Sequence, residues 1–202
     1  MTPARRGAEA TEALRATLID HARQLVDREG ASALTMRALA AQAGCATGLP
    51  YKVFADRQDL VLQIIHAELE RLQAASDELM VRVGRKTVGG NLAWFSGEIL
   101  GSTPVALIRE VAGHDHLSRV VTSRAHSTGV GPGSLETGIT NYLAAEQKAG
   151  RIDGGVDVAA FGFVIAGSIH NLIVSGDAWP RPSRRQLQQR LTAIAAAIAP
   201  LS

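Results

Sequence analysis

The stretch from Leu34 to Leu60, LTMRALAAQAGCATGLPYKVFADRQDL, constrains the fold of this chain most strongly. Thr35 is a favourable N-cap for a short helix in which apolar side chains then recur three and four residues apart. Gly44 follows, where a left-handed residue can end that helix. A second short helix is expected over residues 47–54, and Asp56 can cap a third. A helix, a glycine turn and a second helix make up a helix-turn-helix unit, so the stretch predicts one.

The spaced signature of this stretch is more specific than the bare helix-glycine-helix order. Its positions are Leu34-Thr35-Met36-Arg37, Leu39-Ala40, Gly44, Gly48, Tyr51, Phe54 and Asp56-Arg57-Gln58-Asp59-Leu60. In these residues the chain resembles the TetR-type (TetR/AcrR) transcriptional regulators, and the local resemblance covers about residues 14–65. It implies an all-α fold, with an N-terminal three-helix helix-turn-helix DNA-binding unit joined to a C-terminal helical ligand-binding and dimerisation domain.

Helical periodicity extends on both sides of the signature. We expect one long helix over residues 9–29, preceded by a short disordered segment that is either a frayed end or an arm reaching DNA. Another long helix is expected over residues 57–83. Because no linker interrupts this helix, the domain boundary is placed inside it. The predicted domains are a DNA-binding domain over residues 1–65 and a ligand-binding and dimerisation domain over residues 66–202.

The last two predicted helices differ from the others. Residues 156–174 are apolar nearly all round, and the helix that follows Ser183 carries an apolar stripe. The resemblance implies that these two helices pair with their copies as the four-helix interface of a homodimer. The alternative is that they complete the core of the single chain.

Charge alone does not indicate a nucleic-acid-binding protein. The formal net charge is +2, and residues 1–60 contain 8 basic and 7 acidic side chains. Any DNA binding must therefore depend on a few placed cations and not on a bulk positive field.

The distribution of cysteine and of apolar residues bears on localisation. Cys45 is the only cysteine, which excludes an internal disulfide and suits a reducing compartment. No signal peptide is recognisable, and the most apolar segment, residues 158–174, is at the short limit for a membrane span. We expect that segment to be a buried helix, and the protein to be cytoplasmic without a membrane partner.

The candidate DNA-binding residues follow from the resemblance. Positions matching Thr47, Gly48, Leu49, Tyr51 and Val53 face the major groove in the family, and those matching Thr35, Arg37 and Arg57 touch the DNA backbone. The residue types permit these roles, because hydroxyl groups can donate to phosphate, apolar groups can touch thymine methyls, and a glycine allows close approach. Lys52 is added as a possible contact to phosphate or guanine. The alternative is a helical unit that packs only against protein.

Pro50 departs from the family pattern, in which a leucine is usual at this position. Proline has no backbone N–H and is tolerated only in the first turn of a helix. The second helix of the unit must therefore start late or have an irregular entry. Pro50 and Phe54 are four residues apart, so both are expected to point into the core.

A ligand pocket is expected among the middle and C-terminal helices. Its candidate residues combine apolar surface with a few polar groups, although an ordinary core or surface position is the simpler interpretation of each one taken singly. They are Trp94, Phe95, His114, His126, Phe163, His170 and Asn171.

No catalytic signature is present, and no enzymatic activity is expected. His114 and His116 lack a third ligand at a suitable spacing, so no metal site is expected, and no cofactor is implied. The sequence predicts a ligand-responsive, sequence-specific regulator, a repressor that a small apolar molecule releases from a palindromic operator. A helical small-molecule-binding protein or enzyme with a vestigial helix-turn-helix is the alternative.

Overall fold

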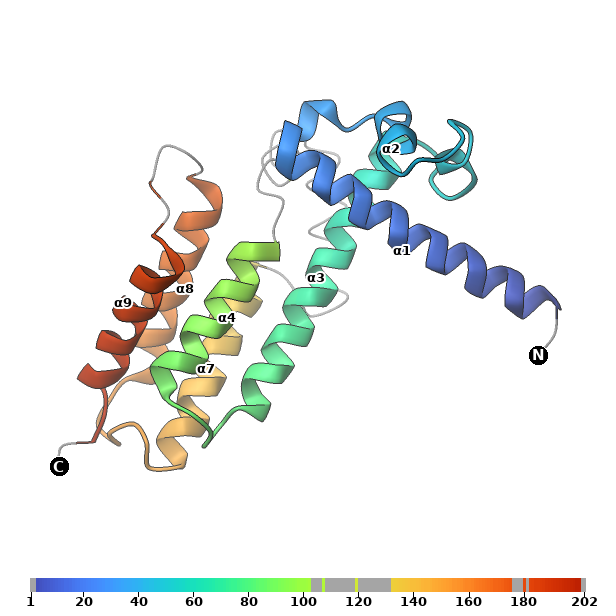
Figure 1. Ribbon diagram of the computed structural model, residues 1–202. Coiled ribbons are helices and arrows are strands. Elements are labelled where there is room, and N and C mark those ends of the chain that lie inside the picture. The colour runs from blue at the N-terminus through green and yellow to red at the C-terminus, as the bar shows by residue number, and fades with distance from the viewer. Residues whose placement is uncertain are drawn as a thin grey trace. The chain divides into compact units, whose positions relative to one another are not determined.

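The structure is a computed structural model that describes residues 3–102, 107, 119, 132–175, 180 and 182–200. All regular elements in these ranges are helical, which confirms the predicted all-α class (Figure 1). The elements are α1 (Pro3–Glu29), η1 (Ala31–Ala33), α2 (Met36–Gln42), η2 (Pro50–Lys52), α3 (Arg57–Val81), α4 (Val88–Ser102), α7 (Pro132–Lys148), α8 (Val158–Val174) and α9 (Arg184–Ala197). Among these helices, none has both the length and the apolar character required to span a bilayer.

The chain forms two compact units. One contains Met1–Ala67 together with Pro104–Val121, and the other contains Glu68–Thr103 and Thr122–Ser202. Helix α3 belongs to both units, because the first division falls inside it. The predicted domains, residues 1–65 and 66–202, and the function assigned to each stay predictions.

The N-terminal unit packs α1 against α2 and the following turns. Leu18 and Leu25 of α1 are buried together with Leu39 of α2 and with Phe54, as their spacing predicts. Helix α1 ends at Glu29, and the next residue, Gly30, has a φ of 85°, in the left-handed region. The prediction for the start of α1 was wrong: the helix begins at Pro3, so residues 3–7 are helical and not a disordered arm.

The C-terminal unit is a bundle in which α4 packs mainly against α9, and α7 against α8 (Figure 1). Its core contains large apolar side chains from all these helices, including Phe95, Ile139, Ile165 and Leu191. The order of contacts shows that α4 and α9 run antiparallel, because Gly89 at the start of α4 lies against Thr192 in the second half of α9.

Gly89 sets the closest approach of α4 to α9. A Cβ atom at this position would lie 2.6 Å from the Cα atom of Thr192 and 3.1 Å from the Leu191 carbonyl oxygen. Since both of these are backbone atoms, no side-chain rotation can remove the overlap.

Gly89→Ala is therefore expected to lower the free energy of unfolding by about 1–3 kcal/mol, because the added methyl group pushes α9 away from α4. Urea-induced unfolding would measure the change. Gly97→Ala in the same helix is a matched control: a Cβ atom there meets nothing within 4 Å, so this change should be neutral or stabilising. Equal stabilities of the two variants would contradict the predicted clash.

A buried polar network joins the turn after α3 to helices α4 and α7. Glu146 is fully buried and accepts hydrogen bonds from the Tyr142 hydroxyl (2.6 Å) and from the Gly84 N–H (3.1 Å). It also pairs with Arg151, at 3.2 Å between Nη1 and Oε2. The Asn91 amide donates to the Tyr142 hydroxyl oxygen at 3.0 Å. These hydrogen bonds and the ion pair offset the free-energy cost of burying the Glu146 carboxylate.

Burial, and secondarily the hydrogen bond to Glu146, raise the pKa of Tyr142 above its ordinary value of 10.0. The folded protein therefore holds this phenol neutral at a pH where the unfolded chain would ionise it. This contribution to stability is fully present below pH 10 and is lost progressively as the pH rises further.

Candidate nucleic-acid interface

Helix α2 has well-defined ends. The Thr35 hydroxyl oxygen accepts a hydrogen bond from the Ala38 N–H at 3.0 Å, which confirms the predicted N-cap. At the other end Gly44 has a φ of 63°, and its N–H donates to the Ala41 carbonyl oxygen at 3.2 Å. The Cys45 N–H donates to the Ala40 carbonyl oxygen at 3.0 Å. This pair of bonds is a Schellman motif, which directs the chain out of α2 into the next turn.

The second helix of the unit is much shorter than predicted. The only regular helix between α2 and α3 is the 3₁₀ turn η2, Pro50–Lys52. The Leu49 N–H donates to the Ala46 carbonyl oxygen at 2.8 Å, and the Lys52 N–H donates to the Leu49 carbonyl oxygen at 3.0 Å. Because Pro50 supplies no N–H, regular α-helical bonding cannot continue through it. The irregular entry that Pro50 predicts is therefore present, and it extends over most of the segment.

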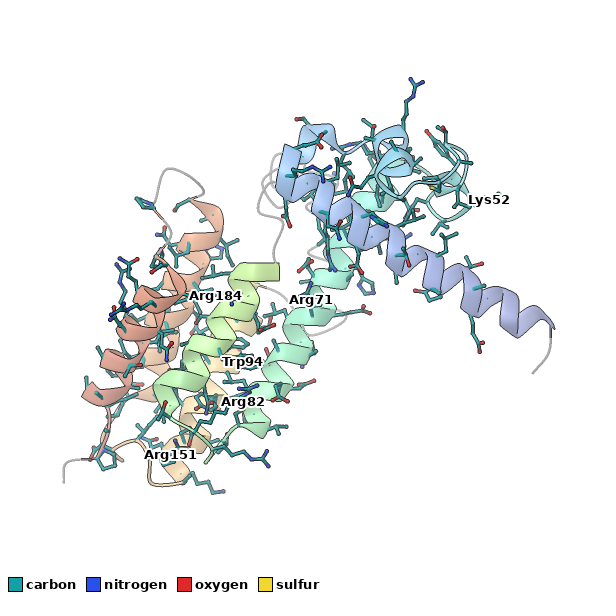
Figure 2. All side chains as sticks on the ribbon, in the orientation of Figure 1. Lys52, Arg71, Arg82, Trp94, Arg151 and Arg184 are labelled. Atoms are coloured by element: carbon teal, nitrogen blue, oxygen red, sulfur yellow. The ribbon has the colours of Figure 1, made fainter. Side chains whose placement is uncertain are left out.

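Residues 47–52 form a surface that we call the exposed turn. Thr47, Gly48, Tyr51 and Lys52 are exposed, and the Tyr51 side chain is 58% exposed. Figure 2 labels Lys52 on this turn. Pro50 is buried in the core beneath this turn. One short segment therefore supplies both a buried apolar residue, which fixes the backbone, and the exposed polar groups.

Gly48 and Leu49 lie in the first half of the exposed turn and present little side-chain surface to solvent. A Cβ atom at Gly48 would meet no other atom within 4 Å, so nothing in the protein itself requires a glycine there. Leu49 is half-buried and presents only part of its side chain.

Two of the predicted contact residues have different surroundings from those expected. Val53 is only 9% exposed and packs in the core beside Phe54, so it offers little surface to a thymine methyl. Arg57 is half-buried: its Nε donates to the Leu34 carbonyl oxygen at 2.6 Å, and its Nη2 donates to the Ala31 carbonyl oxygen at 2.9 Å. Arg57 thus ties the start of α3 to the segment that precedes α2.

The first turn of α3 is capped by two carboxylates. The Asp56 Oδ1 atom accepts from the Asp59 N–H at 2.8 Å, and the Asp59 Oδ2 atom accepts from the Ala55 N–H at 2.9 Å. This is the predicted capping arrangement, with the second bond one residue earlier than in a standard capping box. It fixes the direction in which the chain leaves the exposed turn.

The described members of the predicted pocket differ in their surroundings. Phe95 is fully buried in the core, whereas Phe163, His170 and Asn171 are exposed on α8. Trp94 lines a groove between α4 and α9. His114 and His126 lie outside the described residues. The pocket stays a prediction; the described members differ in burial because an apolar helix does not reveal which of its faces is covered.

Two features had only weak signals in the sequence. From the sequence, Glu146 would be expected on the exposed face of an amphipathic helix, but in the structure its side chain is buried. The groove between α4 and α9 follows from small residues at Gly90, Ala93 and Gly97, whose spacing of three and four places them on one helix face.

Residues 18–64 match the model of a protein family described as bacterial regulatory proteins, tetR family. A comparison with curated proteins gives no match.

Solved structures share the fold over nearly the whole chain. A transcriptional regulator (TerR/AcrR family) from Aquifex aeolicus VF5 has a TM-score of 0.63 at 12% identity, over 91% of this chain and 98% of that one. The TetR family transcriptional regulator PfmR from Thermus thermophilus has a TM-score of 0.59 at 18% identity, over 90% and 96%. The ketosteroid transcriptional regulator KstR2 of Mycobacterium tuberculosis has a TM-score of 0.57 at 17% identity, over 93% and 95%. Residues 18–64 thus match the tetR family of bacterial regulatory proteins, and the chain as a whole shares the fold of solved TetR-family transcriptional regulators.

Proposed function

We propose that the protein is a cytoplasmic, homodimeric repressor that binds a palindromic operator through the exposed turn and leaves it when a small apolar molecule binds. The observation that carries the DNA-binding part is the exposed turn itself. Its hydroxyl and ammonium groups on Thr47, Tyr51 and Lys52 can contact phosphates or base edges. Pro50 and Phe54 hold the backbone beneath them, so these groups need little reordering on binding.

Residues at the start of α2 extend the proposed contact surface. Thr35 and Arg37 are both exposed there, beside the N-terminus of a helix, which favours a phosphate. Arg57 holds the carbonyl group of Leu34 directly before this N-terminus. We therefore assign Arg57 a positioning role, which replaces the direct phosphate contact that the family pattern implies.

Dimerisation is supported by the apolar surface of α8. Phe163 and Val164 are 64% and 54% exposed in the single chain, and Val174 is exposed as well. The outward residues of α9 include Thr192 and Ala196, whose small side chains allow close approach of a partner helix. A two-fold pairing of these surfaces would place two exposed turns on one palindrome, which offsets the low net charge of each protomer.

Two observations support the proposal that an effector releases the protein from its operator: a ketosteroid transcriptional regulator has the same fold, and α3 runs from one unit into the other. KstR2, which shares the fold, is described as a ketosteroid transcriptional regulator, and a steroid-like apolar molecule is one class of effector to test here. Helix α3 starts at the capped turn after the DNA-binding segment and ends in the second unit. A ligand that favours one conformation of the second unit would thereby shift the population that binds the operator.

Tyr51→Ala is expected to weaken operator binding by at least about tenfold, because each half-site loses a hydrogen bond to a charged phosphate. Lys52→Ala should reduce the salt dependence by about one counterion per protomer. Operators selected from a random DNA pool would be titrated at several salt concentrations, with Lys148→Ala as the control for an exposed lysine outside the unit. Undiminished affinity in both variants would refute the assigned face, and absence of any selected DNA would refute the proposal.

Gly48→Ala tests close approach of the backbone to DNA. The folded protein has room for the methyl group, so the free energy of unfolding should not fall. In the complex the methyl group would hold the exposed turn away from DNA, and we expect about a tenfold loss of affinity. Gly154→Ala, at another exposed glycine with the same free space, is the matched control. If both variants bind DNA like the original protein, Gly48 does not face the duplex.

A further inference from the structure

A groove of about 240 Å³ lies between residues 90–98 of α4 and the beginning of α9. At the other end of this antiparallel pair, Gly89 brings the two backbones into contact at Thr192. The groove begins where that contact ends, and Gly97 of α4 and Arg184 of α9 both line it. We call it the α4/α9 groove; Figure 2 labels Trp94 and Arg184, one from each of its two helices.

Gly97 leaves the α4/α9 groove open, although no contact within the protein requires a glycine at this position. It lies within a helix, where glycine costs about 1 kcal/mol relative to alanine. A Cβ atom at Gly97 would meet nothing within 4 Å, in contrast to Gly89, where the neighbouring backbone forbids one. A larger side chain at Gly97 would fill the groove and cover the half-buried Leu187 opposite.

The α4/α9 groove carries one charge of each sign. Glu98 comes from α4 and Arg184 from α9, and both side chains belong to exposed residues. No ion pair joins them in the part of the chain that the structure describes. Arg184 is the first residue of α9, and the first turn of that helix contains no acidic residue, so the Arg184 guanidinium favours an anion. Glu98 correspondingly favours a cation.

The apolar wall of the groove is held in a fixed position. The Trp94 ring lies 3.6 Å, at its centroid, from the guanidinium carbon of Arg82. The Arg82 Nε atom in turn donates to Glu78 Oε1 at 3.0 Å. This stacking restrains the indole, which can then contact an apolar group placed over Gly97 without reordering.

We propose that the α4/α9 groove binds a small zwitterion of the α-amino-acid type that has an apolar side chain. The ligand's carboxylate pairs with Arg184 and the Gln188 amide, and its ammonium group pairs with Glu98. The apolar side chain lies against Trp94 and over Gly97. The volume of the groove is below the range of about 300–1,000 Å³ that is usual for drug-sized ligands, which limits the occupant to a compact molecule. The site does not involve the exposed turn, and of the residues predicted for the apolar pocket it contains Trp94 alone, so it does not depend on DNA binding or on an apolar effector.

The probe is L-phenylalanine, titrated into the full-length protein while the indole N–H resonance of Trp94 is followed by NMR. The chain contains two tryptophans, so a Trp179→Phe variant assigns this resonance. We expect a saturable shift with a Kd of about 1 mM, the scale appropriate to a ligand of this size. The carboxylate-only analogue 3-phenylpropionate and the amine-only analogue phenethylamine should each bind about tenfold more weakly. Equal affinity for either analogue would overturn the zwitterion assignment.

Gly97→Leu should abolish the binding while the protein remains folded, because its side chain occupies the groove. Gly101→Leu is the matched control, since this glycine of α4 also has free space but does not line the groove. Arg184→Gln should weaken binding about tenfold, and Arg185→Gln, at the next residue of α9, should not. No saturable shift at about 10 mM probe, or binding that persists in Gly97→Leu, would overturn the proposal.

Discussion

Glu146→Ala is expected to lower the free energy of unfolding by about 3–5 kcal/mol, the cost of removing one partner from a buried ion pair. The substitution leaves the Tyr142 hydroxyl and the Gly84 N–H without the acceptor that they share. It also creates a cavity at a position with no solvent exposure. Chemical denaturation of the purified protein would measure the loss.

Two further variants distinguish the loss of the polar network from the general effect of a substitution in helix α7. Glu136→Ala, at an exposed glutamate on the same helix α7, should change stability by less than about 0.5 kcal/mol. Arg151→Ala should also lower the free energy of unfolding, because it leaves the fully buried carboxylate with two neutral donors and no cation. A loss below about 1 kcal/mol for Glu146→Ala would show that the network does not stabilise this end of the bundle.

Phe163→Asp is expected to convert the proposed dimer into monomers and to reduce operator affinity by about 100-fold or more. In an isologous interface each substitution occurs twice, so the variant places two carboxylates in an apolar contact. Once the protomers separate, the second exposed turn no longer benefits from the high effective concentration that linkage provides. Sedimentation velocity and operator titration of the same samples would report the two effects.

Met80→Asp is the matched control for this second prediction. Met80 is also an exposed large apolar residue of the second unit, 41% exposed, but it lies on α3. The control variant should remain dimeric and should bind DNA normally. A dimeric Phe163→Asp protein would refute the assigned interface, and a monomeric one with full operator affinity would refute the need for the dimer.

The ends of the DNA-binding elements were predictable from the sequence because their signals are local. Thr35 and Asp56 accept hydrogen bonds from N–H groups three residues further along the chain, and Gly44 supplies the positive φ that ends α2. The irregular entry at Pro50 is equally local, since it results from a missing N–H. The length of that irregularity was not predictable, because the buried Phe54 and the bonds of the surrounding turns decide where the chain becomes regular again.

The sequence by itself thus determined the helical class, the caps, the helix-turn-helix order and the family match of the N-terminal region. Only the tertiary structure decided that Val53 is buried, that Phe163 is exposed and that Glu146 is a core residue. Periodicity establishes which residues share a face of a helix, but it does not identify the element that covers that face. That depends on contacts between residues far apart in the chain, such as Glu146 with Gly84 and Gly89 with Thr192.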